Sequence, residues 1–300
     1  MVSLPQDVTI KEVGPRDGLQ NEKTLIDTEA KISLINQLSE SGLSYIELTS
    51  FVHPKWIPQL KDAVEVAKGI DRKNDLTYAA LVPNLKGLER AIEADVDEVS
   101  IFMSASETHN QKNINKSIDE TYPVLQEVVD GAKQEGKSVR GYISTVFGCP
   151  YEGKIDVNQV MSVCDNLFSM GIDELSIGDT IGVANPVQVH NVLSSMKERF
   201  DQNHLALHFH DTRGMALANT YVALEHGFRT FDGSLGGLGG CPYAKGASGN
   251  VATDDLVHML TEMGIETGVN LDKLTNTGLA IEKHLDKPLP SKQMELARRM

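Results

Sequence analysis

The feature of this 300-residue chain that most limits its fold is a regular alternation of short β-branched segments with longer helical patterns. Each candidate strand is followed by polar, Gly or Pro residues before the next periodic segment begins. The eight candidates are VTIKEV, YIELTS, TYAALV, EVSIFM, RGYISTVF, ELSIGD, LALHFH and TFDGSL. This alternation predicts a parallel sheet, and eight units in about 250 residues favour an α/β fold closed as a (β/α)8 TIM barrel over an open doubly wound sheet.

The same pattern predicts one domain. No fixed-length repeat, low-complexity tract or Pro/Ser-rich linker interrupts residues 1–265, and no G-x-G-x-x-G motif follows the first candidate strand. We therefore expect the barrel to occupy about residues 5–265. The helical pattern VNLDKLTNTGLAIEKHL then predicts a short helical tail over about residues 270–300.

Charge and cysteine content exclude several classes of protein. A formal net charge of −14 argues against nucleic acid or an anionic membrane as a partner, because both require clustered Lys and Arg. The three cysteines form no CxxC pair, which indicates a reducing compartment. We find no signal peptide and no apolar stretch of membrane-spanning length, so we expect a cytoplasmic protein.

In a TIM barrel the chemistry lies at the carboxyl ends of the strands, and ligand-type residues occur there. Alternation along LHFHD places His208 and His210 on one face, and Asp17 in PRDG follows the first candidate strand. Together they could form a mixed oxygen and nitrogen site suited to Mg²⁺ or Mn²⁺, although such a set can also hold Fe²⁺ or Zn²⁺. The alternatives are histidines bonded to nearby carbonyls and an ordinary Asp-Gly turn.

Three further charged residues stand at strand ends. Arg16 precedes Asp17 and could donate to an oxygen that becomes negative during a reaction, or form a surface ion pair. Glu47 in YIELTS and Asp179 in ELSIGD could support a metal or transfer a proton. Each carboxylate could instead cap a helix or form an ion pair.

A glycine-rich segment follows the eighth candidate strand, with seven glycines between residues 233 and 249 and Cys241 among them. Such a loop can close over a barrel mouth and bring the thiol to a ligand. A thiol, whose ordinary pKa is about 8.5, can exchange a proton near neutral pH, whereas a buried structural thiol would be inert. Asn250, at the end of the loop, could bind a metal through its amide oxygen or cap the helix that begins in VATDDLVHML.

These motifs together resemble the 3-hydroxy-3-methylglutaryl-CoA lyase family. The likeness runs from EVGPRDGLQNE through ELTSFVHPKW, GYISTVFGCPYEGK, GDTIGVANP and HFHDT to GLGGCPYAKGASGNVATDD, so it covers nearly the whole chain. The last segment is the most specific. PRDGLQ and HFHD are of a kind shared with other metal-dependent barrels, including isopropylmalate and homocitrate synthases.

The resemblance implies cleavage of 3-hydroxy-3-methylglutaryl-CoA to acetyl-CoA and acetoacetate in leucine degradation, by a homodimer with a divalent cation. By motif, the implied metal ligands are Asp17, His208, His210 and Asn250, and the implied catalytic residues are Arg16, Glu47, Asp179, His208 and Cys241. Arg16 would also bind the substrate's thioester oxygen. Because an acyl-CoA substrate is anionic, three lysines in loop segments are candidates for its binding: Lys23, Lys55 and Lys112.

Three other hypotheses remain open at this point. A Claisen-type synthase would use the same metal site to condense an acyl-CoA with a 2-oxo acid. A binding barrel without catalytic activity could respond to oxidation through an intermolecular disulfide at Cys241. An iron oxygenase with two histidines and one carboxylate would depend on oxygen.

Overall fold

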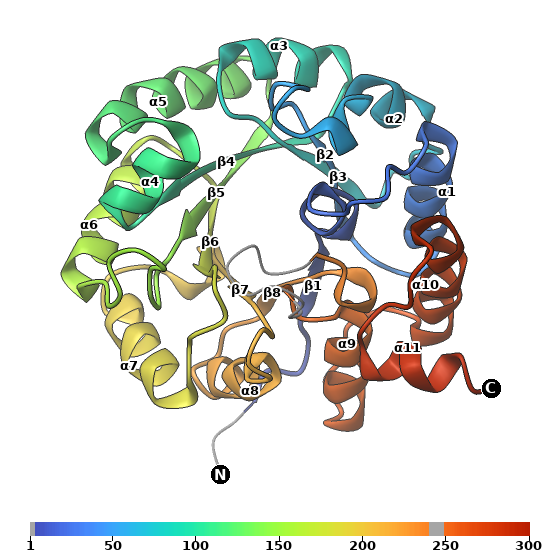
Figure 1. Ribbon diagram of the computed structural model, residues 1–300. Helices are drawn as coiled ribbons and strands as arrows, with labels where there is room; N and C mark the ends of the chain where they lie inside the picture. The colour runs from blue at the N-terminus through green and yellow to red at the C-terminus, as the bar shows by residue number, and fades with distance from the viewer. Residues whose placement is uncertain (1–3, 240–248) are drawn as a thin grey trace.

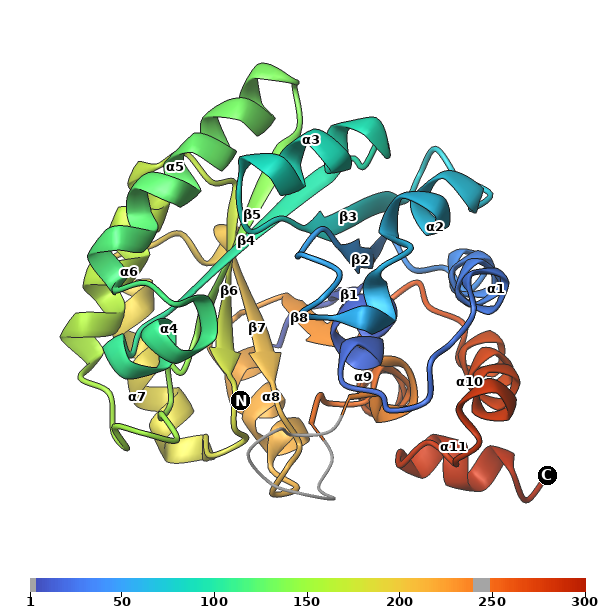
Figure 2. The same ribbon diagram turned by 45° about the horizontal axis from the view of Figure 1, so that its top comes forward.

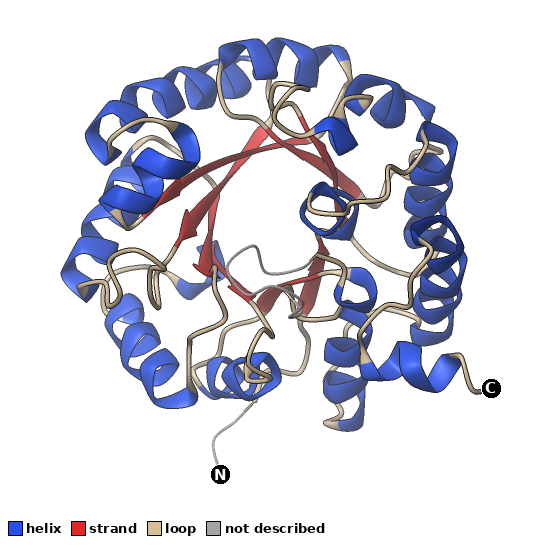
Figure 3. Ribbon diagram, in the orientation of Figure 1, coloured by secondary structure: helices blue, strands red, loops and turns tan. Residues whose placement is uncertain are grey.

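The computed structural model describes residues 4–239 and 249–300, and it places eight parallel strands in a closed barrel in chain order. β8 pairs with β1 and closes the ring, with Thr9 opposite Thr230 and Glu12 opposite Gly233. The strands form the inner ring and the helices surround them (Figures 1 and 3). The predicted (β/α)8 fold class is confirmed. The strands are β1 (Thr9–Glu12), β2 (Tyr45–Ser50), β3 (Thr77–Leu81), β4 (Glu98–Ser104), β5 (Ser138–Ser144), β6 (Glu174–Asp179), β7 (Leu205–Phe209) and β8 (Thr230–Gly233).

Helices follow the strands where the sequence supplies start signals. Asp27, Asn84 and Ser117 each accept a hydrogen bond from a backbone N–H in the first turn of the helix they precede, and Ser117 forms a capping box with Glu120. The α-helices are α1 (Thr28–Ser39), α2 (Ala63–Gly69), α3 (Leu85–Glu93), α4 (Glu107–Ile114), α5 (Ile118–Gln134), α6 (Val157–Ser169), α7 (Pro186–Lys197), α8 (Ala216–Glu225), α9 (Thr253–Glu262), α10 (Leu271–Leu285) and α11 (Lys292–Ala297). Short helical turns are η1 (Gly14–Gly18), η2 (Pro58–Leu60), η3 (Gln202–His204) and η4 (Leu235–Gly237).

Most strand residues are buried because the helices cover the outer face and side chains fill the interior. All six residues of β2 are buried, and so are five of the six in β6. This explains why these strands carry apolar residues in runs as well as in alternation. No helix among the described residues is long and apolar enough to span a membrane.

The two last helices lie outside the eight repeated units. α10 lies beside α1, and α11 leads to the carboxyl terminus (Figures 1 and 2). The segment between them contacts the turn that follows β8, since the Ser291 N–H donates to the Gly236 carbonyl at 3.2 Å. Asp255 of α9 accepts the N–H groups of Lys292 and Gln293. The tail therefore packs against its own barrel, next to the loop between β8 and α9.

Candidate active site and metal centre

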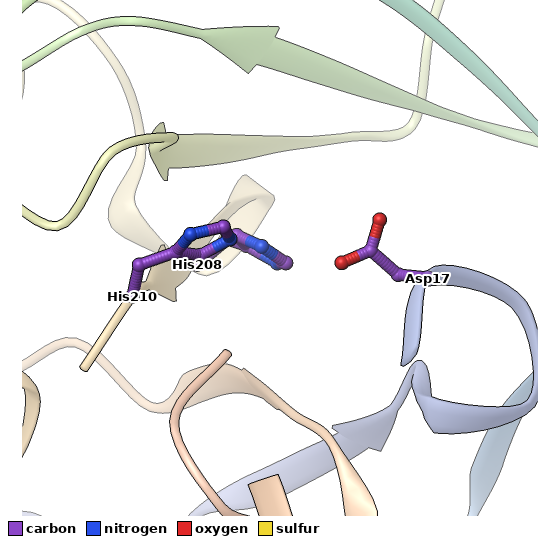
Figure 4. Close-up of side chains that lie close together, drawn as sticks. All are labelled: Asp17, His208 and His210. Atoms are coloured by element: carbon purple, nitrogen blue, oxygen red, sulfur yellow. The ribbon is translucent and has the colours of Figure 1, made fainter. Parts of the chain in front are cut away.

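Three ligand-type side chains meet at the carboxyl end of the barrel. One candidate ligand atom from each of Asp17, His208 and His210 lies within 4.8 Å of the others. Figure 4 shows both imidazole rings directed toward the Asp17 carboxylate across the barrel mouth. The three side chains line a cavity of about 680 Å³ together with Arg16, Gln20, Tyr142 and Asn250. The structure thus brings Asp17 next to two histidines that lie 191 and 193 positions after it in the sequence.

Asp17 is positioned by the turn η1 at the end of β1. The Val13 carbonyl accepts the backbone N–H groups of Arg16 and Asp17 at 3.2 and 2.7 Å. Arg16 then donates from Nη1 to Asp17 Oδ1 at 2.6 Å and from Nε to Glu47 Oε2 at 2.5 Å. Gln20 donates to the same Asp17 oxygen at 2.7 Å. Arg16 is buried, so its ion pairs are interior contacts instead of the surface pair considered from the sequence.

The charges in this turn shift one another's proton affinity. Burial alone would raise the pKa of Asp17, but Arg16 and the nearby imidazoles outweigh it and lower the pKa. Burial raises the pKa of Glu47, although Arg16 opposes this effect. The pKa of Arg16 is raised because the carboxylates of Glu47 and Asp17 outweigh its loss of hydration. Asp17 is therefore held as a carboxylate, the form that binds a cation.

The two histidines have different surroundings. His208 Nδ1 lies 3.1 Å from Asp232 Oδ2, a pairing that leaves Nε2 as the nitrogen facing the site. Burial would lower the pKa of His208, but the hydrogen bond and charge of Asp232 outweigh it and raise the pKa. Burial and the neighbouring His208 lower the pKa of His210 to about 3, so this imidazole is neutral. His210 Nδ1 is buried and has no hydrogen-bond partner among the described residues.

Asn250 joins the site through its side chain and caps no helix. α9 begins after Ala252, and no side chain caps its first turn. Asn250 Nδ2 donates to Asp17 Oδ2 at 2.7 Å and to the Leu238 carbonyl at 3.3 Å. Its amide oxygen is buried and, within the described parts of the chain, has no donor. An unpartnered amide oxygen, an unpartnered imidazole nitrogen and a carboxylate fit a divalent cation that takes oxygen and nitrogen ligands.

The two other predicted carboxylates, Glu47 and Asp179, lie on different strands around the Asp17, His208 and His210 site. Glu47 is fully buried in β2 and reaches the site through Arg16. Asp179 ends β6, and its two oxygens accept the N–H groups of Val183 and Ala184 at 2.9 and 3.1 Å. Burial raises the pKa of Asp179 to about 6 against these bonds. Its neighbours Gly178 and Thr180 line the cavity, although Asp179 itself is not among the described lining residues.

The remaining predicted residues are absent from the described cavity lining or lie outside the described parts of the chain. Cys241 lies in residues 240–248, outside the described residues. Lys23, Lys55 and Lys112 are exposed, and the described lining of the cavity does not include them. Lys112 lies over the Tyr151 ring at 4.9 Å. The structure therefore gathers the predicted metal ligands but not the three predicted lysines.

Sequence reasoning missed several residues in or beside the site, among them Gln20, Lys116, Tyr142 and Asp232. Asp232 and Tyr142 do carry a signal, since a carboxylate and a phenol inside predicted barrel strands must point into the barrel or against a helix. Tyr142 lies edge-on to His208 and under the Arg16 guanidinium. Gln20 and Lys116 lie outside predicted strands, and no sequence pattern distinguishes Lys116 from Lys112.

Comparison with known proteins gives a consistent set of relatives. The HMGL-like family model matches residues 7–281. The chain is 59% identical over 292 residues to the hydroxymethylglutaryl-CoA lyase of Bacillus subtilis (strain 168), an alignment that covers 97% of this chain and 98% of the relative. It is 52% identical over 292 residues to the mitochondrial hydroxymethylglutaryl-CoA lyase of Homo sapiens, covering 97% and 90% of the two chains.

A solved structure gives the same result for the fold. The HMG-CoA lyase from Acinetobacter baumannii, in complex with coenzyme A and 3-methylmalate, superimposes with a TM-score of 0.93 at 44% identity. The superposition covers 98% of this chain and 96% of that structure. Similarity therefore extends through the barrel and the two helices that follow it.

Proposed function

This chain belongs to the HMGL-like family, and we propose that it is a lyase that cleaves 3-hydroxy-3-methylglutaryl-CoA to acetyl-CoA and acetoacetate. The observation that carries the proposal is the group formed by Asp17, His208 and His210 at the mouth of a barrel that aligns with such lyases over nearly its whole length. Chain length matches these relatives as well, because the alignment covers 98% of the Bacillus protein.

We assign Asp17, His208, His210 and Asn250 as the residues that hold a divalent cation, Mg²⁺ or Mn²⁺. The orphaned Asn250 oxygen and His210 nitrogen support this assignment, as does the Asp232 bond that fixes the His208 ring. A bound divalent ion supplies Lewis-acid chemistry, which makes a coordinated hydroxyl more acidic and fixes its orientation.

Arg16 stabilises the negative charge that develops on the thioester oxygen when the C2–C3 bond of the substrate breaks. Its Nε and Nη1 donate to Glu47 and Asp17, which hold the guanidinium in one orientation. Nη2 donates to no described residue, and Arg16 lines the cavity. A donor fixed in advance in this way acts on the transition state without a reorganisation cost.

Asp179 accepts the proton of the substrate's tertiary hydroxyl. The sequence left His208 and Asp179 as alternatives. Because Nδ1 of His208 is bonded to Asp232 and Nε2 would hold the cation, neither ring nitrogen would be free to take the proton. The pKa of Asp179, raised to about 6, makes it an ionised base of moderate strength at neutral pH. Its backbone hydrogen bonds at 2.9 and 3.1 Å hold the carboxylate next to the cavity lining.

We assign to Cys241 the protonation of the acetyl-CoA carbanion. The support is the position of Cys241 in a glycine-rich segment bounded by Gly239 and Asn250, both of which line the cavity. Cys241→Ala should bind Mn²⁺ as the wild type does but lose about 10³-fold in kcat, because the general acid is missing. Near-normal turnover of this variant would remove the thiol from the mechanism.

The direct test of the activity is a coupled lyase assay on chelator-stripped protein with added Mg²⁺ or Mn²⁺. We expect acetoacetate to form only after the metal is restored, with the same rate in the absence of oxygen. Incubation with acetyl-CoA and a panel of 2-oxo acids is the counter-test. Release of free CoA there, without lyase activity, would identify a synthase instead.

We also propose that the protein works as a single-domain homodimer in the cytoplasm, in leucine degradation. This part of the proposal is supported by the family to which the chain belongs. Light scattering of the purified protein, with an expected mass of twice 32.8 kDa, tests the assembly. A deletion strain that still grows on leucine as sole carbon source would contradict the metabolic role.

A further inference from the structure

The last residue of β1, Glu12, has a fully buried carboxylate that contacts three separate segments. Its Oε1 accepts the N–H of Gly14 at 2.7 Å and the N–H of Leu235 at 2.9 Å. Its Oε2 accepts the Thr253 hydroxyl at 2.6 Å. The donors belong to the turn η1, to η4 and to the first residue of α9. One side chain therefore joins the end of β1 to both ends of the loop between β8 and α9.

The segments joined in this way carry two of the proposed metal ligands. η1 contains Asp17, and Asn250 lies three residues before Thr253. On the other side of the loop, Ser234 Oγ donates to the Leu238 carbonyl at 2.8 Å, and Asn250 Nδ2 donates to the same carbonyl and to Asp17 Oδ2. Through these hydrogen bonds and the backbone between them, Glu12 is linked to Asp17 by way of η1 and to Asn250 by way of η4 and the Leu238 carbonyl.

The segments joined in this way are also in close contact. A Cβ atom on Gly14 would lie 2.5 Å from Glu12 Oε1, and one on Gly18 would lie 2.7 Å from Ser234 Oγ. The turn that carries Asp17 therefore packs with its backbone directly against Glu12 and Ser234. Displacement of either partner must move the turn.

The carboxylate of Glu12 is held by hydrogen bonds and not by an ion pair. Among the described residues, no Lys, Arg or His forms a salt bridge with it, whereas Glu47 and Asp17 both pair with Arg16. Burial raises the pKa of Glu12 to about 7, although its three hydrogen bonds oppose this. Burial of an acidic group without a cation is costly, so its donors determine where this side chain lies.

We propose that Glu12 is a positioning residue for the cation site, where it holds the turn that carries Asp17 against the segment that carries Asn250. The described contacts of the fully buried Glu12 carboxylate are all with Gly14, Leu235 and Thr253, so it acts through these segments and not on substrate. The inference rests on the proposed function only in assuming that the site holds a divalent cation. A purely structural role predicts lower stability without a change in metal affinity.

The test measures Mn²⁺ affinity directly, by the electron paramagnetic resonance signal of free Mn²⁺ over chelator-stripped full-length protein. We expect Glu12→Ala to weaken Mn²⁺ binding by about 10- to 100-fold, as loss of outer-shell support does in other metal sites. Glu12→Gln should restore the affinity to within about threefold of wild type, since its amide oxygen can accept both N–H groups. Thr253→Val, which removes one of the three donors, should weaken binding by about threefold or more.

A matched control is the buried carboxylate of Glu98, at the opposite end of the barrel. Glu98 accepts the hydroxyls of Tyr45 and Ser138, each at 2.9 Å. Glu98→Ala should lower the unfolding temperature and bind Mn²⁺ as tightly as wild type. This control separates loss of stability from loss of metal positioning.

The outcomes distinguish this inference from the proposed function. Wild-type protein that binds no Mn²⁺ would overturn both. Wild type that binds Mn²⁺, together with a folded Glu12→Ala variant of equal affinity, would overturn only the role of Glu12, as would equal weakening in Glu98→Ala. If Glu12→Ala does not fold, Thr253→Val decides: unchanged affinity in that variant overturns the inference.

Discussion

Two polar groups of the barrel interior differ in how completely their members are paired. At the carboxyl ends of the strands, Asn250 Oδ1 and His210 Nδ1 are buried without a described partner. Toward the amino ends, a network formed by Lys11, Arg140, Glu174 and Asp232 has an internal partner for every charge. Buried polar atoms are costly when unpaired, so the first group indicates a site for a ligand and the second a structural element.

Several short hydrogen bonds hold the network of Lys11, Arg140, Glu174 and Asp232 together. Arg140, fully buried, donates from Nη2 to Asp232 Oδ1 and from Nε to Glu174 Oε1, each at 2.6 Å. Lys11 also donates to Glu174, and Ser176 donates to Asp232 at 2.8 Å. Asp232 then contacts His208, which belongs to the group at the carboxyl ends of the strands. The two groups therefore meet at Asp232, and substitutions on either side of it should have different effects.

The largest loss of activity is expected from a substitution in the group at the carboxyl ends of the strands. Asp17→Ala removes the proposed carboxylate ligand. We expect kcat/KM to fall by about 10⁴-fold, because several kcal/mol of metal-dependent transition-state stabilisation are lost. Circular dichroism should remain that of wild type. Residual activity above one tenth of the wild-type value in the lyase assay would show that this group is not the metal centre.

Asp179→Asn removes the proposed base while keeping its shape, and kcat should fall by about 10³-fold. With a pKa of about 6, the wild-type carboxylate is ionised above that pH, so wild-type kcat should decline below about pH 6. The variant's residual activity should lack this acid limb. A wild-type profile that is flat from pH 5 to 7 would argue against Asp179 as the base.

The raised pKa of Asp179 also has a consequence for stability. The folded state binds the carboxyl proton of Asp179 more tightly than the unfolded state does. Its contribution to the free energy of unfolding is therefore fully present below the ordinary pKa of 3.8 and is lost as pH rises through about 6. Asp179→Asn should therefore show a smaller loss of unfolding free energy between pH 4 and 6 than wild type. Chemical denaturation at several pH values measures the difference.

Asp232→Asn acts on both groups. Loss of the charge weakens the hydrogen bond that orients His208 and leaves Arg140 with Glu174 alone as its described ion-pair partner. We expect Mn²⁺ affinity to fall by about 10- to 100-fold and the free energy of unfolding to fall by about 3–5 kcal/mol. Loss of stability with unchanged Mn²⁺ affinity would mean that the two groups are independent.

The smallest effect on activity is expected in the paired network. Glu174→Gln should keep kcat within about twofold of wild type and lower the free energy of unfolding by about 1–3 kcal/mol. The pKa of Glu174 is lowered because Arg140 and Lys11 outweigh its burial, so its stabilisation is present above the ordinary pKa of 4.5 and is lost as pH falls below it. The variant should lose less stability than wild type on acidification; an equal loss would contradict this role.

The sequence was sufficient for the barrel and for the proposed ligands because both follow from local patterns. Strand and helix periodicity predicts the eight units, and the strict alternation of LHFHD places two imidazoles on one face. The turn PRDG at the end of β1 supplies Asp17. The role of the three lysines in substrate binding stays a prediction: they are exposed and absent from the described cavity lining, and the direction of a long exposed side chain depends on packing that no local pattern encodes.

By itself, then, the sequence determined the order of the elements and indicated that Asp17, His208 and His210 meet at the barrel mouth. Only the tertiary structure decided which buried polar groups are paired. It pairs Asp232 with His208 and Arg140, Asn250 with Asp17, and Glu12 with Leu235 and Thr253. The physical reason is that these contacts join residues 24 to 241 positions apart. Such pairs are fixed by barrel closure and strand register, which no local pattern encodes.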